Sequence, residues 1–272
     1  MATARRTRVR AAVAVAAILV VLGVVAAVAG GRDADEVPLF VFAGQSNMLA
    51  LGTDVQDLPK ALTGPSSDAE VWDARALRWL DLEPPETGNF GPELSALPAL
   101  ARGLGTDVVA VKVAVGATSL ATVWDPEASD GLYALMRDAV IDALSTSPPG
   151  RGKPRLAGVF WMQGEADAQR PDWAAAYGKN LTHFISSLRR DFSDPDLPVV
   201  VARIRAEEAS LRPGGEQVRR ALDLVSRSTP HTRTIHTDDL ALVADQVHFD
   251  SDATLTLGRR FAAAYLALAD AG

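Results

Sequence analysis

The chain has 272 residues, a formal net charge of −7 and no cysteine. The lack of cysteine excludes disulfides, thiolate catalysis and thiolate zinc sites. The mild acidity argues against a nucleic-acid partner, because the arginine pairs at 189–190, 219–220 and 259–260 fall in helical stretches and are interpreted as solvated faces. The about 235 residues that follow the N-terminal segment fit one α/β domain better than two small ones.

The N-terminal segment has the pattern of a membrane-targeting sequence. Residues 1–10 form a basic region with four arginines, which predicts a cytoplasmic start, and residues 11–30 are an uncharged apolar run close to the ~20 residues that span a bilayer. The length of the run favours an uncleaved transmembrane signal anchor, but Ala27–Ala29 also satisfies the small-residue rule of a cleaved signal peptide. Both alternatives predict an extracytoplasmic domain that follows a polar linker at 31–36.

Residues 37–272 alternate between strand-like and helix-like segments. We predict strands at 37–43, 107–115, 155–162, 197–204 and 232–237, and helices at 91–105, 131–145, 170–192, 215–228 and 251–270. This alternation predicts a three-layer α/β/α sandwich around a mostly parallel five-stranded sheet. Segment 69–82 carries large residues in alternation and is predicted to be a small antiparallel β-hairpin insertion.

In such a sheet the ligand crevice lies beyond the carboxyl ends of the strands. Polar and small residues gather at four of these places: 44–48, 116–124, 163–167 and the loop before the last helix. The coincidence predicts an active site at this edge.

Ser46 opens a helix directly after the first predicted strand. Its hydroxyl would lie at the ligand edge, and its own N–H is one of the donors that a first helical turn leaves unpaired. An isolated serine at this position is more often only an N-cap. The lipase-type G-x-S-x-G elbow is also absent, because Met48 occupies the second glycine position. Ser46 is therefore a candidate nucleophile only in combination with the other clusters.

The second and third clusters supply candidate hydrogen-bond donors. Gly116 directly follows a predicted buried strand, and the side-chain amide of Gln163 follows another. Such donors stabilise negative charge that develops on oxygen. Glu165 and Asp167 suggest a metal site at first sight, but no histidine adjoins them, so we expect neither a metal nor another cofactor.

The fourth cluster supplies a base. His248 follows Asp245 by three residues, a spacing that lets the carboxylate accept the imidazole Nδ1–H and leaves Nε2 free as a base. The other three histidines are interpreted as structural. Together the clusters contain a nucleophile, a base, an orienting carboxylate and three oxyanion donors, which is the set that ester cleavage needs.

These segments resemble a known family. "FVFAGQSNM", "VAVGATSL", "FWMQGEADA" and "DQVHFD" are similar, in order, to the blocks of the sialate O-acetylesterases and carbohydrate esterase family six, in the SGNH-hydrolase superfamily. The resemblance implies a flavodoxin-like sheet and metal-free removal of O-acetyl groups from sugars. It implies Ser46 as nucleophile, His248 as base and Asp245 as acidic partner, with an oxyanion hole formed by Ser46, Gly116 and Gln163.

The resemblance also implies supporting residues: Gln45, Asn47, Gly91, Glu93 and Glu165, the last as a carboxylate that holds neighbouring loops. One position departs from the family pattern, because Ala117 stands where the family commonly has the second glycine of a pair. We expect its methyl group to narrow the acyl pocket or to keep the backbone from a positive φ.

The predicted function is a serine O-acetylesterase acting on a carbohydrate of sialate or xylan type, either a small molecule or a polysaccharide. Two alternatives remain open. One is an esterase for another short acyl ester, such as one in peptidoglycan or lipid. The other is a carbohydrate-binding relative without turnover.

Overall fold

The computed structural model describes residues 36–205 and 213–270, and the chain from Val37 onward forms one compact unit. The predicted basic region, the apolar run and nearly all of the linker lie outside the described residues. Within those residues, no helix combines the length and apolar character needed to cross a bilayer.

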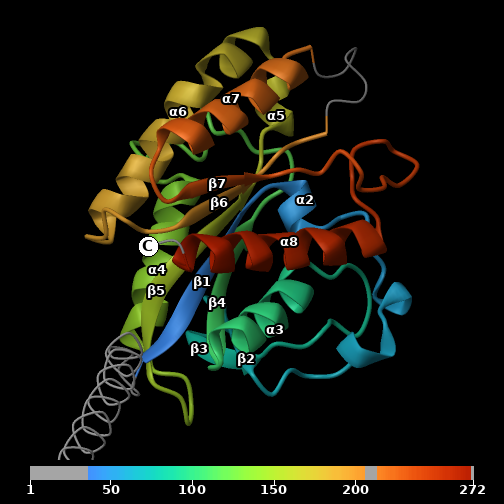
Figure 1. Ribbon diagram of the computed structural model, residues 1–272, viewed down its shortest axis with the longest axis vertical. Helices are drawn as coiled ribbons and strands as arrows, with labels where there is room; N and C mark the ends of the chain where they lie inside the picture. Colours follow the sequence, from blue (N-terminus) through green and yellow to red (C-terminus); the bar gives the residue numbers. More distant parts are fainter. Residues whose placement is uncertain (1–35, 206–212, 271–272) are drawn as a thin grey trace, which may run out of the picture. The chain divides into compact units, whose positions relative to one another are not determined.

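Seven strands form one sheet in the order β3-β2-β4-β1-β5-β6-β7 (Figure 1). Their bounds are β1 Glu36–Gly44, β2 Ala69–Asp73, β3 Arg78–Asp81, β4 Val108–Ala114, β5 Lys153–Met162, β6 Val199–Ala202 and β7 Thr232–Ile235. The prediction of a mostly parallel sheet flanked by helices is confirmed, but the prediction of five strands is wrong. The hairpin β2–β3 extends the sheet, because β2 pairs in parallel with the otherwise exposed edge of β4 while β3 pairs antiparallel with β2.

Helices cover both faces of the sheet (Figure 1). They are α3 Glu93–Leu104, α4 Leu132–Ser145, α6 Pro171–Asp191, α7 Gly215–Ser228 and α8 Ser251–Ala269, with short α2 Ser46–Leu49, α5 Glu165–Ala168 and the 3₁₀ turns η1 Val55–Asp57 and η2 Lys60–Leu62. Helices α3 and α8 pack together on one face, and α4, α6 and α7 cover the other.

Strand β5, next to the central strand β1, is buried on both faces, which explains its nearly continuous apolar sequence. The ring of Phe160 lies 5.1 Å from that of Phe261 in α8, whereas the next residue, Trp161, lies 4.4 Å from Phe184 in α6. Side chains from both helix layers therefore pack against this strand. The packing fixes the position of its carboxyl end and of the loop that follows it.

Gly44 brings β1 and β5 together where the first strand ends. It has a φ of 151°, and a Cβ atom at this position would lie 2.0 Å from the carbonyl oxygen of Met162. The next N–H, of Gln45, donates to that carbonyl at 3.0 Å. Only glycine can adopt this φ and leave room for the carbonyl of Met162. The close contact directs the chain from β1 into α2 and so fixes where that helix begins.

Candidate active site

A cavity of about 270 Å³ lies where the segments that follow β1, β4 and β5 meet the segment that precedes α8. Its lining includes Gln45, Ser46, Gly116, Glu165 and His248. The fold therefore brings residues from all four sequence clusters to one place.

Ser46 is the first residue of α2 and is 5% exposed. Gly116 is close to it, since a Cβ atom built on Gly116 would lie 3.8 Å from the Ser46 Cβ. The N–H groups of these two residues donate to no other described residue. Within the described residues, no hydrogen bond joins the Ser46 hydroxyl to the imidazole of His248, although both line the cavity. Such bonds are often long before substrate binds.

His248 is oriented by Asp245. Nδ1 of the imidazole lies 2.6 Å from Oδ2 of the carboxylate, and Oδ1 accepts the N–H groups of Val247 at 2.8 Å and His248 at 3.0 Å. Gln246 takes a left-handed φ of 57°, which closes this turn. Burial by itself raises the pKa of Asp245, but the two N–H groups and the imidazole outweigh it and hold the pKa below its usual value. The carboxylate thus stays charged and fixes the Nδ1–H tautomer.

Asn47 holds the backbone on both sides of His248. Its Nδ2 donates to the carbonyl of Val247 at 3.1 Å, and its Oδ1 accepts the N–H of Phe249 at 3.0 Å. Nδ2 also donates to Glu165 at 2.7 Å. Asn47 is 1% exposed. The residue that follows Ser46 in the chain therefore sets the position of the histidine.

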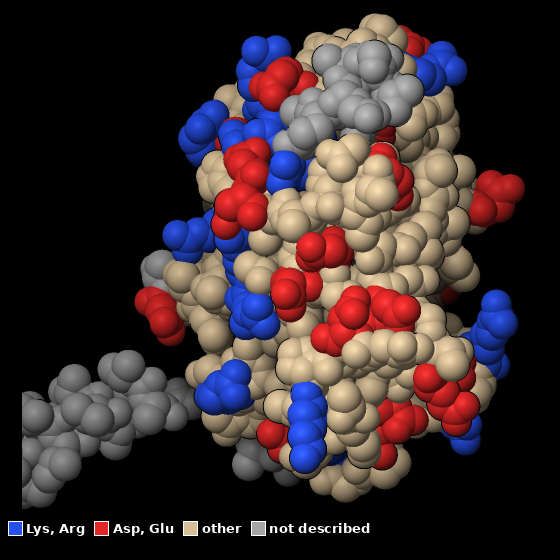
Figure 2. Space-filling model, turned by 90° about the vertical axis from the view of Figure 1, so that its right-hand side faces the viewer, with Lys and Arg blue, Asp and Glu red and all other residues tan. Residues whose placement is uncertain are grey.

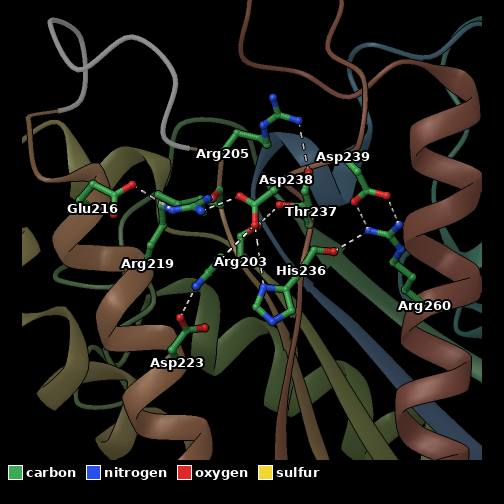
Figure 3. Close-up of polar contacts among 11 residues, drawn as sticks. Arg203, Arg205, Glu216, Arg219, Asp223, His236, Thr237, Asp238, Asp239 and Arg260 are labelled. Carbon is green, nitrogen blue, oxygen red and sulfur yellow. Dashed lines mark hydrogen bonds and ion pairs between the residues drawn. The ribbon is translucent and has the colours of Figure 1, made fainter.

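We call residues 236–250 the histidine loop. Its first residues are held by ion pairs (Figure 3). Arg203 and Arg219 bind Asp238 at 3.0 and 2.5 Å, and Arg260 binds Asp239 at 2.5 Å. The interpretation of the pairs containing Arg219 and Arg260 as solvated helix faces missed this role, because their partners follow β7 and are distant in sequence.

The structure does not bring the amide of Gln163 to the cavity. This side chain is fully buried, and its Nε2 donates to Asp167 at 2.6 Å, to the carbonyl of Thr118 at 2.9 Å and to Gln45 at 3.2 Å. Gln163 therefore supports, from beneath, the loop that contains Gly116. Its amide does not offer a donor to a ligand in the cavity.

Asp167 shapes the same loop. Its two oxygens accept the N–H groups of Leu120 at 2.9 Å and Ala121 at 3.0 Å. Burial raises the pKa of this carboxyl, and the Gln163 amide and the two N–H groups reduce the rise without cancelling it. Across the described ranges, no group of three or more His, Cys, Asp or Glu side chains is arranged to hold a metal ion.

Gln45 presents its amide at the cavity. Its Oε1 accepts from Gln163 Nε2 at 3.2 Å and from the N–H groups of Gly164 at 3.5 Å and Ala166 at 3.3 Å. Three donors around one atom identify it as the oxygen. The Nε2 of Gln45 donates to no other described residue. The sequence placed Gln45 only among the supporting residues, since spacing does not reveal which of two amides faces the ligand.

Ala117 lines the cavity with a φ of 57°. The expectation that its methyl group keeps the backbone from a positive φ is wrong. The fold imposes this conformation at a cost of about 1–2 kcal/mol, because the neighbouring residues of the loop are tied to Gln163 and Asp167.

Gly91 and Glu93 line a different cavity, of about 350 Å³. Glu93 binds Lys112 there at 2.7 Å.

The fold, a mostly parallel sheet flanked by helices, is similar to that of SGNH hydrolase structures. It superposes on the structure of an Arabidopsis thaliana protein with a TM-score of 0.72 at 22% identity, covering 86% of this chain and 99% of that one. The TM-score with NanS is 0.66 at 17% identity, over 89% of this chain and 100% of NanS. A carbohydrate acetylesterase from Xanthomonas citri gives 0.62 at 19% identity, over 86% of this chain and 57% of that one.

Residues 36–267 match the model of the family described as carbohydrate esterase, sialic acid-specific acetylesterase. The chain belongs to this family and is an acetylesterase, a carboxylic ester hydrolase. It is also 25% identical, over 84% of its length and 90% of the relative, to a probable carbohydrate esterase from Arabidopsis thaliana.

Proposed function

We propose that the chain removes O-acetyl groups from a carbohydrate of sialate or xylan type through an acyl-enzyme on Ser46. The observation that carries this proposal is the shared cavity of Ser46 and His248, with Nδ1 of His248 held 2.6 Å from Asp245. Nε2 of His248 takes the proton as Oγ of Ser46 attacks the acetyl carbonyl. His248 then protonates the departing sugar oxygen, and water repeats both steps to release acetate.

Three donors at the cavity are suited to the oxyanion: the N–H groups of Ser46 and Gly116 and the Nε2 of Gln45. Their lack of other acceptors among the described residues supports this assignment. Gln45 takes the role that the sequence assigned to Gln163, whose Nε2 is already bound to three acceptors. Each donor of this kind typically lowers the barrier by roughly 2.7–4 kcal/mol.

The cavity favours a short acyl group. Its volume is about 270 Å³, and the methyl group of Ala117 occupies part of its wall. Release of 4-nitrophenol from the acetyl ester should therefore exceed release from the octanoyl ester.

The decisive experiment replaces the nucleophile. Ser46→Ala should fold normally and lose turnover of 4-nitrophenyl acetate, and a fluorophosphonate should label Ser46 in the wild type only. Wild-type-like hydrolysis by Ser46→Ala would end the proposal. An unlabelled wild type without turnover would favour a carbohydrate-binding protein.

We also propose that this domain works outside the cytoplasm. The support is the arginine-rich region at 1–10 followed by the apolar run at 11–30, as a signal anchor or a cleaved signal peptide. An alkaline phosphatase fusion after residue 36 should be active, and an inactive fusion would contradict this location.

A further inference from the structure

The cavity of about 350 Å³ adjoins the one that contains Ser46. The same two segments line both: α2 contributes Leu49 to one and Ser46 to the other, while Ala114 at the end of β4 lines one and Gly116, just after the strand, lines the other. A hydrogen bond also crosses between them, since Nδ2 of Asn89 donates to the carbonyl of Leu51 at 3.2 Å. The linings of the two cavities therefore touch, which is the arrangement that a substrate with its acetyl group at Ser46 and a further sugar unit in the second cavity would need.

The second cavity contains the ion pair of Lys112 and Glu93, whose charged groups a ligand can reach. Nζ of Lys112 lies 2.7 and 2.8 Å from the two oxygens of Glu93, and the side chains are 23% and 14% exposed. A Cβ atom on Gly91 would lie 2.1 Å from that Nζ, so the absence of a side chain there makes room for the pair.

The ion pair can still donate a hydrogen bond to a ligand and accept hydrogen bonds from it. An ammonium has three N–H donors and Lys112 uses two of them on Glu93, which leaves one. The carboxylate keeps acceptor positions beyond the two that it uses. Neighbouring hydroxyls of a sugar ring match this combination, because one can accept from Lys112 while the other donates to Glu93. The charges of Lys112 and Glu93 cancel, so nothing in the pair attracts a ligand of net charge.

The surroundings favour neutral ligands over anions. Glu165 lines the cavity that contains Ser46, and the charged carboxylate of Asp245 lies directly behind His248. On the face toward which the histidine loop projects, carboxylates occupy the middle, whereas most Lys and Arg side chains lie toward the margins (Figure 2). A sugar carboxylate bound here would meet like charges, which disfavours binding.

From these contacts we infer that the second cavity is a binding subsite for a neutral sugar unit of the substrate, recognised through two hydroxyls by Lys112 and Glu93. This inference rests on the proposed function and selects the xylan-type substrate over the sialate type, because sialic acid carries a carboxylate.

The experiment compares kcat/KM for mono-O-acetylated xylobiose, O-acetylated sialic acid and 4-nitrophenyl acetate, which has no sugar. The wild type should prefer the xylobiose ester to the sialic acid ester by at least about tenfold, the effect of one hydrogen bond to a charged group. Glu93→Gln leaves Lys112 without its counter-charge. Relative to 4-nitrophenyl acetate, this variant should lose about tenfold on the xylobiose ester, and the ratio of sialic acid ester to xylobiose ester should rise about tenfold. Lys112→Gln should lose the xylobiose preference without gaining activity on the sialic acid ester.

Glu70→Gln is the matched control. Glu70 forms a similarly buried ion pair, with Arg151, and is not among the residues that line the second cavity. The ratios of kcat/KM among the three substrates should be the same in Glu70→Gln as in the wild type. Unchanged ratios in Glu93→Gln, or a wild-type preference for the sialic acid ester, would overturn the inference. Calorimetric binding of unacetylated xylobiose and sialic acid tests the subsite separately from turnover, so a failed mechanism and a failed subsite are distinguishable.

Discussion

At its first residues the histidine loop is held by ion pairs, whereas around His248 it is held by the amide of Asn47. Asp238 and Asp239, which bind the arginines, are 50% and 68% exposed. Asn47 is buried, uncharged and bound to the backbone of both neighbours of His248. Water screens the first attachment and is excluded from the second. The exposed end should therefore contribute modestly to stability, while the buried end determines where the imidazole lies.

The largest expected effect comes from Asn47→Ala, which breaks the buried attachment. Val247, Phe249 and Glu165 each lose a partner, so the free energy of unfolding should fall by about 3 kcal/mol. A displaced imidazole should lower kcat on 4-nitrophenyl acetate about 100-fold, more than it changes KM. Asn89→Ala, which removes a different loop-binding amide, is the control. Equal kcat in both variants would contradict a specific role for Asn47.

Asp238→Asn removes two ion pairs at the exposed start of the histidine loop, because Asp238 binds both Arg203 and Arg219. We expect a loss of about 1 kcal/mol in urea unfolding, since the ion pairs form a network. The value of kcat should fall less than about fivefold, because Asn47 still holds His248. Asp138→Asn, in an exposed ion pair on α4, provides the comparison. A loss of kcat as large as that of Asn47→Ala would remove the distinction between the two ends.

Arg260→Met should have a smaller effect, because Asp239 and Arg260 form a single exposed pair beside one bond to the carbonyl of His236. The melting temperature should fall only slightly, because water screens the pair, and activity should stay within about twofold. Arg259→Met is the matched control one residue earlier on α8. Indistinguishable melting temperatures would show that the pair adds nothing to stability.

The smallest effect is a pH dependence confined to the exposed end. Hydrogen bonding to Arg260 lowers the pKa of Asp239 to about 2. Because the folded pKa is depressed, the stabilisation is complete above the ordinary value of ~3.9 and is lost as pH falls through about 2. In urea unfolding, wild type and Asp239→Asn should differ at pH 5 and converge near pH 2. A stability difference between the two proteins that persists near pH 2 would show that the difference does not come from the charge of Asp239.

Local periodicity was sufficient for the main elements, since each predicted strand and helix exists within a few residues of its predicted bounds. The place of the hairpin was not predictable in this way. Segment 69–82 has the pattern of two paired strands, but its pairing with β4 joins residues about forty positions apart, through Ala69 and Val108.

The site could be predicted as a set of strand ends, but not as a set of side-chain directions. Gln45 and Gln163 both follow buried strands, and only their neighbours decide which amide faces the cavity. Asp167 and Thr118 bind the amide group of Gln163, while Gly164 and Ala166 bind the oxygen of Gln45. Asp167 is only 4 positions from Gln163, but Thr118 is 45 positions from Gln163, and Gly164 and Ala166 are 119 and 121 positions from Gln45, so spacing within one motif does not encode the outcome.

Ser46 and Asn47 are consecutive residues on one short helix; Ser46 carries the hydroxyl that we propose as the nucleophile, and Asn47 holds the chain on both sides of His248. Because these hydrogen bonds tie α2 to the backbone on both sides of His248, a displacement of α2 should carry that backbone with it. We therefore expect the separation between the Ser46 hydroxyl and the His248 imidazole to vary less than the positions of the surrounding loops, without a rigid frame around the whole cleft.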